Sequence, residues 1–120
     1  MNLPNLGTLI AAVEAAVKAE TFDMSSYKHD CRSPACIIGH AAALANDGLV
    51  PSSHIAMMKT AADYLGITYG DAVEIGIGWA GTRVEPSLAP TDQQALAYLK
   101  LTQKIEHFIS WPEFLGEPRT

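Results

Sequence analysis

Both cysteines of the chain and two of its four histidines fall between His29 and His40, in the stretch HDCRSPACIIGH. The spacing, H-x-C-x4-C-x3-H, combines the side chains that bind zinc with the pair used in thiol catalysis. Three interpretations are open: a zinc site, a catalytic cysteine, or the start of a buried helix. The residues that follow, AAAL, carry no charge, which is typical of a helix buried on most sides.

A zinc site would use His29, Cys31, Cys36 and His40 as ligands. Cys36 and His40 would share one face of a helix, and the other two would come from the incoming loop. Common zinc motifs add a distant second pair of ligands, and this spacing matches none of them. A disulfide between the two cysteines is disfavoured in a reducing compartment. A chain of 120 residues can bury a core without a metal or a disulfide. We therefore expect no cofactor, with zinc as the alternative.

A catalytic site would use Cys36 as nucleophile and His40 as base. Ser33 and Pro34 are typical of an N-cap and a first helical position. Cys36 would then lie in the first turn, where the helix dipole lowers the pKa of a thiol. Catalytic cysteines usually take their histidine from another element, and no oxyanion-hole sequence accompanies this pair. We favour a structural role, with Cys36 in the core, His40 bonded to a backbone carbonyl and no catalytic residue.

Helical periodicity runs through nearly the whole chain. It predicts an all-α fold, a compact bundle of about five helices in a single domain spanning residues 1–120. N-caps are predicted at Ser33, Thr68 and Thr91, and helix ends at Gly48 and Gly66. The apolar tail, residues 110–120, is expected to pack on the bundle or to form a homodimer contact. The five predicted helices cover about residues 6–19, 34–46, 54–65, 71–77 and 92–109.

The composition excludes several classes of protein. With 48% apolar and 18% charged residues the chain is globular, and its net charge is -5. The eight basic residues are scattered, so binding to nucleic acid is not expected. AADYLGITYGDAVEIG resembles the turn of a helix-turn-helix, but its second helix would present Tyr69, Asp71 and Glu74 to DNA. No apolar run approaches the ~18 residues of a membrane span, and no secretory signal is visible. We expect a cytoplasmic protein that does not enter a membrane.

A loop is predicted over WAGTRVEPSLAP, residues 79–90, and it is the candidate binding edge. Trp79 and Arg83 are the candidate binding residues, because Trp and Arg are over-represented at interface hot spots. The expected partner is a protein, or a small metabolite or nucleotide.

Two blocks of the sequence resemble a family of short bacterial and phage proteins. They are FDMSSY at Phe22–Tyr27 and CRSPACIIGHAAAL at Cys31–Leu44. The family pattern is F-D-M-x-x-[WY], a short gap, and then C-G-T-x-x-C-I-A-G-[WH]-A. AADYLGIT at Ala61–Thr68 resembles the second signature of the family. This chain departs by carrying Arg32-Ser33-Pro34 where the family usually has G-T-x, although the serine keeps the cap oxygen.

The resemblance implies a phage or prophage accessory context, and no particular reaction. The position of His40 is often Trp in the family, which argues against an essential histidine. We predict a non-enzymatic accessory binding protein, with counter-defence against a host protein or a small nucleotide as a role that this context allows. The alternatives are a cysteine-dependent enzyme built on Cys36 and His40, and a zinc-stabilised interaction domain.

Overall fold

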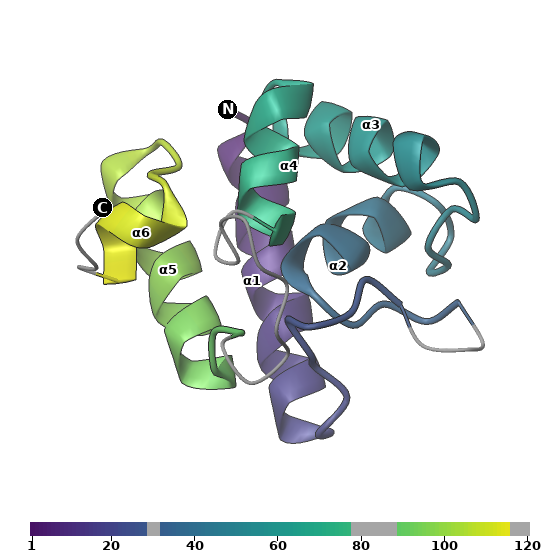
Figure 1. Cartoon of the computed structure of the whole chain (residues 1–120), viewed down its shortest axis with the longest axis horizontal. Helices are drawn as coiled ribbons and strands as arrows, with labels where there is room; N and C mark the ends of the chain where they lie inside the picture. Colours follow the sequence, from purple (N-terminus) through teal and green to yellow (C-terminus); the bar gives the residue numbers. More distant parts are fainter. Residues whose placement is uncertain (29–31, 78–88, 116–120) are drawn as a thin grey trace.

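The computed structural model describes residues 1–28, 32–77 and 89–115 (Figure 1). Six helices and no strand occur in these ranges, which confirms the prediction of an all-α fold. None of these helices is long and apolar enough to cross a membrane. The helices are α1 (Leu3–Lys18), α2 (Ile37–Leu44), α3 (His54–Leu65), α4 (Tyr69–Ile77), α5 (Asp92–Ile105) and α6 (Trp111–Leu115).

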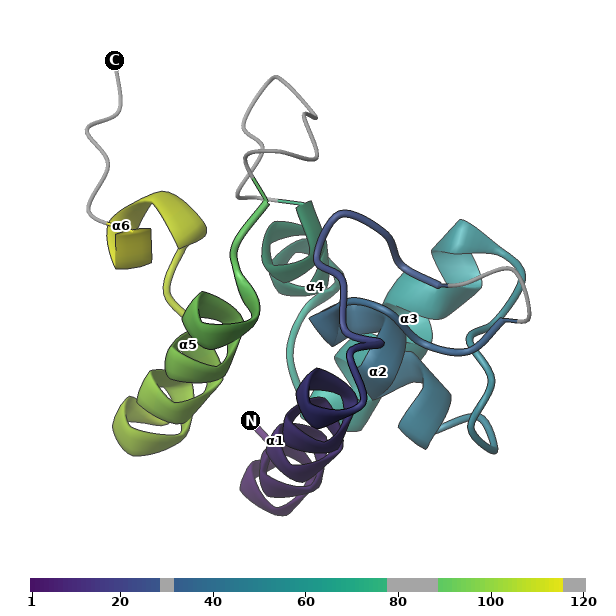
Figure 2. The same ribbon diagram turned by 90° about the horizontal axis from the view of Figure 1, so that it is seen from below.

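Helix α1 lies at the centre of the bundle. It contacts α2 and α3, and separately α5, while α2 packs on α3 and α3 on α4. Figures 1 and 2 both show α5 beside α1, with α2 and α3 on the other side of α1. Leu6, Leu9 and Val13 are fully buried along α1, so its apolar stripe is the spine of the core.

Local end signals place α3 and α5 as predicted. Ser53 Oγ accepts a hydrogen bond from the Ala56 N–H at 3.3 Å and so caps α3. Gly66 ends that helix in the left-handed region, with φ of 68°. Thr91 and Gln94 form the predicted capping box at the start of α5, with bonds of 3.1 and 2.9 Å.

Helix α1 begins earlier than the predicted Leu6. Asn2 is its N-cap, and the Asn2 side chain accepts from the Asn5 N–H at 3.0 Å. Pro4 lies in the first turn, where its missing N–H needs no partner. The cap residue is asparagine, one of the best caps, so the signal was present in the sequence.

Helix α2 begins later than predicted. Its N-cap is Cys36, and the prediction of Ser33 as the cap is wrong. The reason is a contact from outside the helix, because Pro34 forms an isolated antiparallel bridge with Lys28. This pairing holds the backbone extended where the helix was expected to start. Helix α2 also ends earlier than predicted, at Leu44.

The tail folds back onto the bundle. Glu106 ends α5 in the left-handed region, with φ of 64°, before the predicted end near Ile109. Trp111 is fully buried and stacks on Tyr98, with ring centroids 4.0 Å apart. Its Nε1–H donates to the Ile75 carbonyl at 2.8 Å, which ties α6 to α4. The tail adds a sixth, short helix to the five that were predicted.

Candidate functional site

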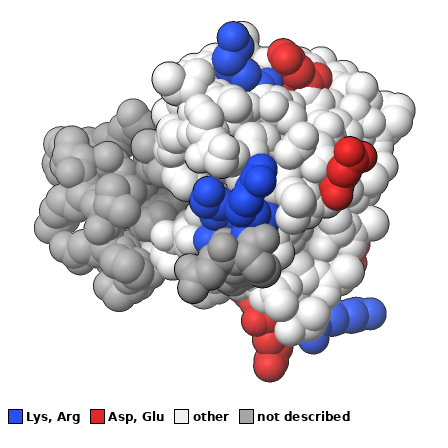
Figure 3. Space-filling view, turned by 90° about the vertical axis from the view of Figure 1, so that its right-hand side faces the viewer, with Lys and Arg blue, Asp and Glu red and all other residues white. Residues whose placement is uncertain are grey.

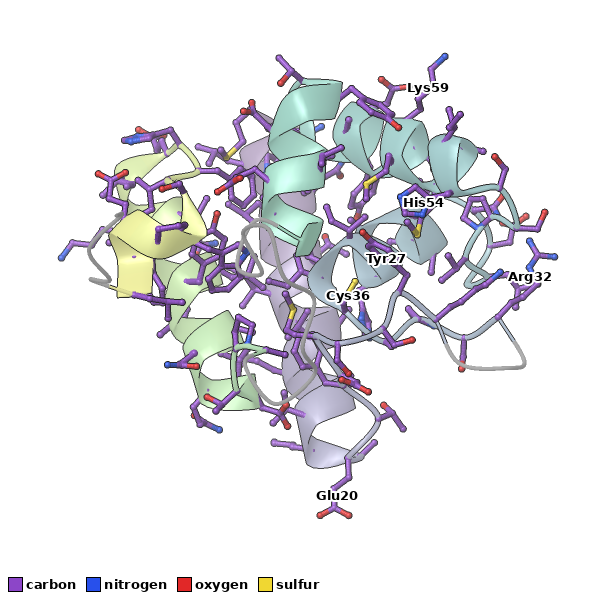
Figure 4. All side chains as sticks on the ribbon, viewed as in Figure 1. Glu20, Tyr27, Arg32, Cys36, His54 and Lys59 are labelled. Carbon is purple, nitrogen blue, oxygen red and sulfur yellow. The ribbon has the colours of Figure 1, made fainter. Side chains whose placement is uncertain are left out.

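The segment before α2 folds over the start of this helix and brings part of the cysteine–histidine stretch into the core. The Asp23 N–H donates to the Ala35 carbonyl at 2.9 Å, and the Ala35 N–H donates to the Tyr27 carbonyl at 3.1 Å. The Tyr27 carbonyl oxygen lies directly against Gly39, at a place where any side chain would clash. Figure 4 shows Tyr27 close to Cys36 in this region. The glycine therefore permits the close approach that buries Cys36.

Cys36 is a core residue at the start of α2. It is 1% exposed, and its Sγ accepts a hydrogen bond from the Gly39 N–H at 3.4 Å. Burial raises the pKa of the Cys36 thiol to about 11, although backbone N–H groups at the helix start act to lower it. Removing the thiolate from water thus outweighs the helix terminus, so the pKa is raised where the alternative of a catalytic Cys36 required it to be lowered. The thiol is protonated at neutral pH.

His40 is buried beside it and is bonded to the backbone. Its Nδ1 lies 2.8 Å from the Cys36 carbonyl oxygen, and because a carbonyl only accepts, Nδ1 carries the proton and donates. The ring also packs against Phe22, with centroids 5.7 Å apart. This is the backbone-bonded histidine that the sequence predicted. Its Nδ1 proton reinforces the first turn of α2 and is directed at the carbonyl of Cys36, away from the sulfur.

We expect Cys36 to resist alkylation in the native protein. In a Cys31→Ser variant, which keeps one cysteine, iodoacetamide at neutral pH should react at least about a thousandfold more slowly in buffer than in concentrated urea. The reason is that a buried thiol reacts only when the fold opens, and opening costs several kcal/mol. Mass spectrometry of quenched samples measures the rate. Fast modification of the folded variant would instead support Cys36 as a nucleophile.

The same thiol should make the fold sensitive to high pH. The folded state holds the proton more tightly than the unfolded state, since the thiol pKa rises from 9.0 to about 11 on folding. This stabilisation is complete below about pH 9 and is lost as the pH rises through 11, a loss of about 2–3 kcal/mol. Urea unfolding at about pH 8 and pH 10.5 measures it.

The matched variant for this measurement is Cys36→Ser, which keeps an acceptor for the Gly39 N–H and does not ionise. It should lose clearly less stability on going to high pH. Burial also raises the pKa of Tyr27 to about 12 and raises the pKa of Tyr98, so an alkaline loss from these two tyrosines should remain in both proteins. Equal losses in the two proteins would assign the alkaline sensitivity to groups other than Cys36.

The zinc alternative includes His29 and Cys31, which lie outside the described residues. Within the described ranges, no three His, Cys, Asp or Glu side chains are grouped as metal ligands would be. Cys36 and His40, the two described candidates, each bond to the backbone of α2.

The predicted binding residues Trp79 and Arg83 also lie outside the described residues. Elsewhere, an open groove of about 530 Å³ runs between the start of α4 and the end of α5. Its lining includes the carboxylates of Asp71 and Glu106, beside Phe108. Carboxylates repel phosphate groups, so this groove does not suit a nucleotide.

A surface that the sequence did not single out lies between α2 and α3. Six large hydrophobic side chains are exposed among the described residues, and three of them lie at the end of α2, in the connection and at the start of α3. They are Leu44 (38% exposed), Leu49 (45%) and Ile55 (63%). We call these three residues the apolar surface.

Hydrogen bonds hold the backbone of the connection between α2 and α3, which carries Leu49. The Val50 N–H donates to the Arg32 carbonyl, and Arg32 Nε donates to the Val50 carbonyl, both at 2.9 Å. Asn46 Nδ2 donates to the Leu49 carbonyl at 2.8 Å. The Val50 side chain is fully buried, so it anchors the backbone that displays Leu49. A contact surface on a fixed backbone loses little conformational entropy when it binds.

Comparisons of the chain with protein-family models, with curated proteins and with solved structures find no match. The resemblance of Phe22–Tyr27 and Cys31–Leu44 to short phage and bacterial proteins therefore stays a prediction.

Proposed function

We propose that this chain is a non-enzymatic binding protein that docks on a protein partner through the apolar surface of Leu44, Leu49 and Ile55. The observation that carries the proposal is that these three exposed side chains lie close together along the chain, from the end of α2 to the start of α3, and that hydrogen bonds hold the connection between the two helices. In the context that the sequence resemblance implies, the protein is a phage or prophage accessory factor. Counter-defence against a host protein is the role that fits this context.

The chemistry of the cysteine–histidine stretch supports a binding role over catalysis. A nucleophile has to reach its substrate and lose its proton, whereas Cys36 is buried and its pKa is raised to about 11. The groove at Asp71 and Glu106 does not favour a nucleotide at that place, because a phosphate there would lie against two carboxylates.

Affinity capture from a bacterial host lysate tests the proposal, with Ile55→Gln as the main variant. Ile55 is the most exposed of the three residues, so the change should leave folding intact while removing apolar contact area. We expect the captured host protein to bind about tenfold more weakly or to be lost. Ile105→Gln is the matched control, because Ile105 is also exposed (37%) but lies on α5.

Circular dichroism should show that both variants are folded. Capture that survives Ile55→Gln as fully as Ile105→Gln would remove the apolar surface as the docking site. Replacing Trp79 or Arg83 then becomes the next measurement, since these are the binding residues that the sequence predicted. Failure of the wild-type protein to retain any protein at near-equal stoichiometry would contradict the proposed function itself.

A further inference from the structure

We propose that the groove between the start of α4 and the end of α5 binds a linear aliphatic amine with two or more ammonium groups. The ammonium groups of this ligand bind the carboxylates of Asp71 and Glu106, and its methylene chain lies against Ile67 and Phe108. The groove shares no residue with the apolar surface, so this inference does not rest on the proposed function.

The first observation is the size and the lining of the groove. Its volume of about 530 Å³ falls within the range of small-molecule sites, roughly 300–1,000 Å³. The chain from the end of α3 into α4 supplies Ile67 and Asp71, and the chain just past α5 supplies Glu106 and Phe108. The Phe108 ring packs on Tyr98, with centroids 6.0 Å apart. Each of the two segments therefore contributes one carboxylate and one apolar side chain.

The second observation is the negative charge of the lining. It contains no Lys or Arg, and neither Asp71 nor Glu106 takes part in an ion pair among the described residues. The amino group of Met1 offsets one of these two carboxylates, which leaves an excess of one negative charge. Arg83 and Arg119 lie outside the described residues, and the excess refers to the lining alone. Figure 3 shows Lys and Arg side chains gathered on the face away from α5 and α6, on another side of the molecule.

The third observation is that two helices end at the groove. Gly66 caps the C-terminus of α3 and Glu106 caps that of α5, and both residues line the groove. A helix C-terminus carries about half a negative charge from its aligned peptide dipoles. Helix α4 begins at the same place with the opposite sign, so it cancels one of the two ends. The backbone therefore adds to the negative potential that the side chains create.

A neighbouring tyrosine also responds to the carboxylates of this region. Burial raises the pKa of Tyr98, and the negative charges of Glu74 and Asp71 raise it further. A cation paired with these carboxylates would cancel their effect on the phenol. The negative charge at the start of α4 thus acts on its surroundings without compensation from the described residues.

A linear amine fits this lining better than a metal ion does. Within the described ranges, no three His, Cys, Asp or Glu side chains are grouped as metal ligands would be. Methylene groups can pack on the apolar side chains of the groove, and an ammonium group is attracted to the face of an aromatic ring such as Phe108. Carboxylates from two separate segments suit a ligand with a charge at each end.

Titration of the ¹⁵N-labelled protein with putrescine and with butylamine tests the inference by nuclear magnetic resonance. The two probes have the same carbon chain, but butylamine has a single ammonium group and can bind a single carboxylate. At matched ionic strength, putrescine should bind at least about fivefold more tightly. The amide signals of Thr68, Asp71, Glu106 and Phe108 should shift most, because these residues line the groove.

Two variants test the carboxylates one at a time. Asp71→Asn and Glu106→Gln each remove a charge and keep the size of the side chain, so each should weaken putrescine binding about fivefold. Asp47→Asn is the matched control, because Asp47 is exposed on the connection between α2 and α3 and does not line the groove. Asparagine also tolerates its left-handed backbone, with φ of 53°. The control should bind putrescine as wild type does, and circular dichroism should show that all three variants are folded.

Equal binding of putrescine and butylamine would overturn the inference. Shifts spread evenly over the acidic residues of the chain, or equal weakening by Asp47→Asn and Glu106→Gln, would show a general attraction of cations and would overturn it too. Failure of the wild-type chain to bind spermidine at up to about 5 mM would remove the groove as an amine site. The Ile55→Gln variant should bind putrescine normally, so the result is independent of the proposed function.

Discussion

Replacing Gly39 with alanine is expected to unfold the protein or to lower its free energy of unfolding by more than about 3 kcal/mol. Gly39 lies inside α2, where alanine is ordinarily the better helix former. A Cβ at this position would meet the carbonyl oxygen of Tyr27 far inside van der Waals contact. That carbonyl is backbone and accepts the Ala35 N–H, so it cannot move without breaking the layer that covers Cys36.

Gly7→Ala is the matched control, because Gly7 also lies inside a helix, α1. A Cβ there would come no closer than 3.6 Å to Gln103 Nε2, the end of a flexible side chain. The control should be more stable than wild type by about 0.5–1 kcal/mol, the usual gain of alanine over glycine in a helix. Urea unfolding followed by circular dichroism measures both. Equal midpoints for Gly39→Ala and wild type would show that the segment before α2 does not pack on Gly39.

Replacing Trp111 with alanine is expected to lower the free energy of unfolding by about 3–5 kcal/mol. Trp111 is fully buried, stacks on Tyr98 and meets the Phe114 ring edge to face, with centroids 5.9 Å apart. Truncation would leave a cavity between α5 and α6 and remove the bond to the Ile75 carbonyl. The measurement is again urea unfolding, with a fold check by near-ultraviolet circular dichroism.

Trp111→Phe separates packing from hydrogen bonding. Phenylalanine keeps most of the stacking area on Tyr98 but cannot donate to the Ile75 carbonyl, so we expect a smaller loss of about 1–2 kcal/mol. A loss below about 1 kcal/mol for Trp111→Ala would show that the tail is dispensable for the core. In that case its apolar side chains would be better explained by the homodimer contact that the sequence also allowed.

Predictions from the sequence succeeded where a few neighbouring residues control the outcome. Gly66, Thr68 and the Thr91–Gln94 pair act on backbone groups within one turn, so their cap chemistry can be read directly from the sequence. The apolar stripe of α1 is likewise local, because helical spacing alone places its residues on one face. The identification of His40 as a backbone-bonded core residue also needed only its apolar surroundings.

Predictions failed where a segment outside a helix contacts its start. Ser33 and Pro34 carry a good helix-start signal, but Pro34 pairs with Lys28 and the cap is Cys36. The alternative of a catalytic Cys36 depended on a lowered thiol pKa, and burial raises that pKa instead. The helix terminus is visible in the sequence, whereas the layer that removes Cys36 from water is not.

The sequence by itself determined the all-α class, the helices with strong caps and the apolar stripes that form the core. Only the tertiary structure decided which apolar residues stay outside, since Val50 is buried while its neighbour Leu49 is 45% exposed. The physical reason is that cap and periodicity energies depend on residues a turn apart, whereas exposure depends on which elements pack against a residue. Leu49 stays at the surface beside a backbone that is held because Val50 is buried and bonded to Arg32, a contact between residues far apart in the chain.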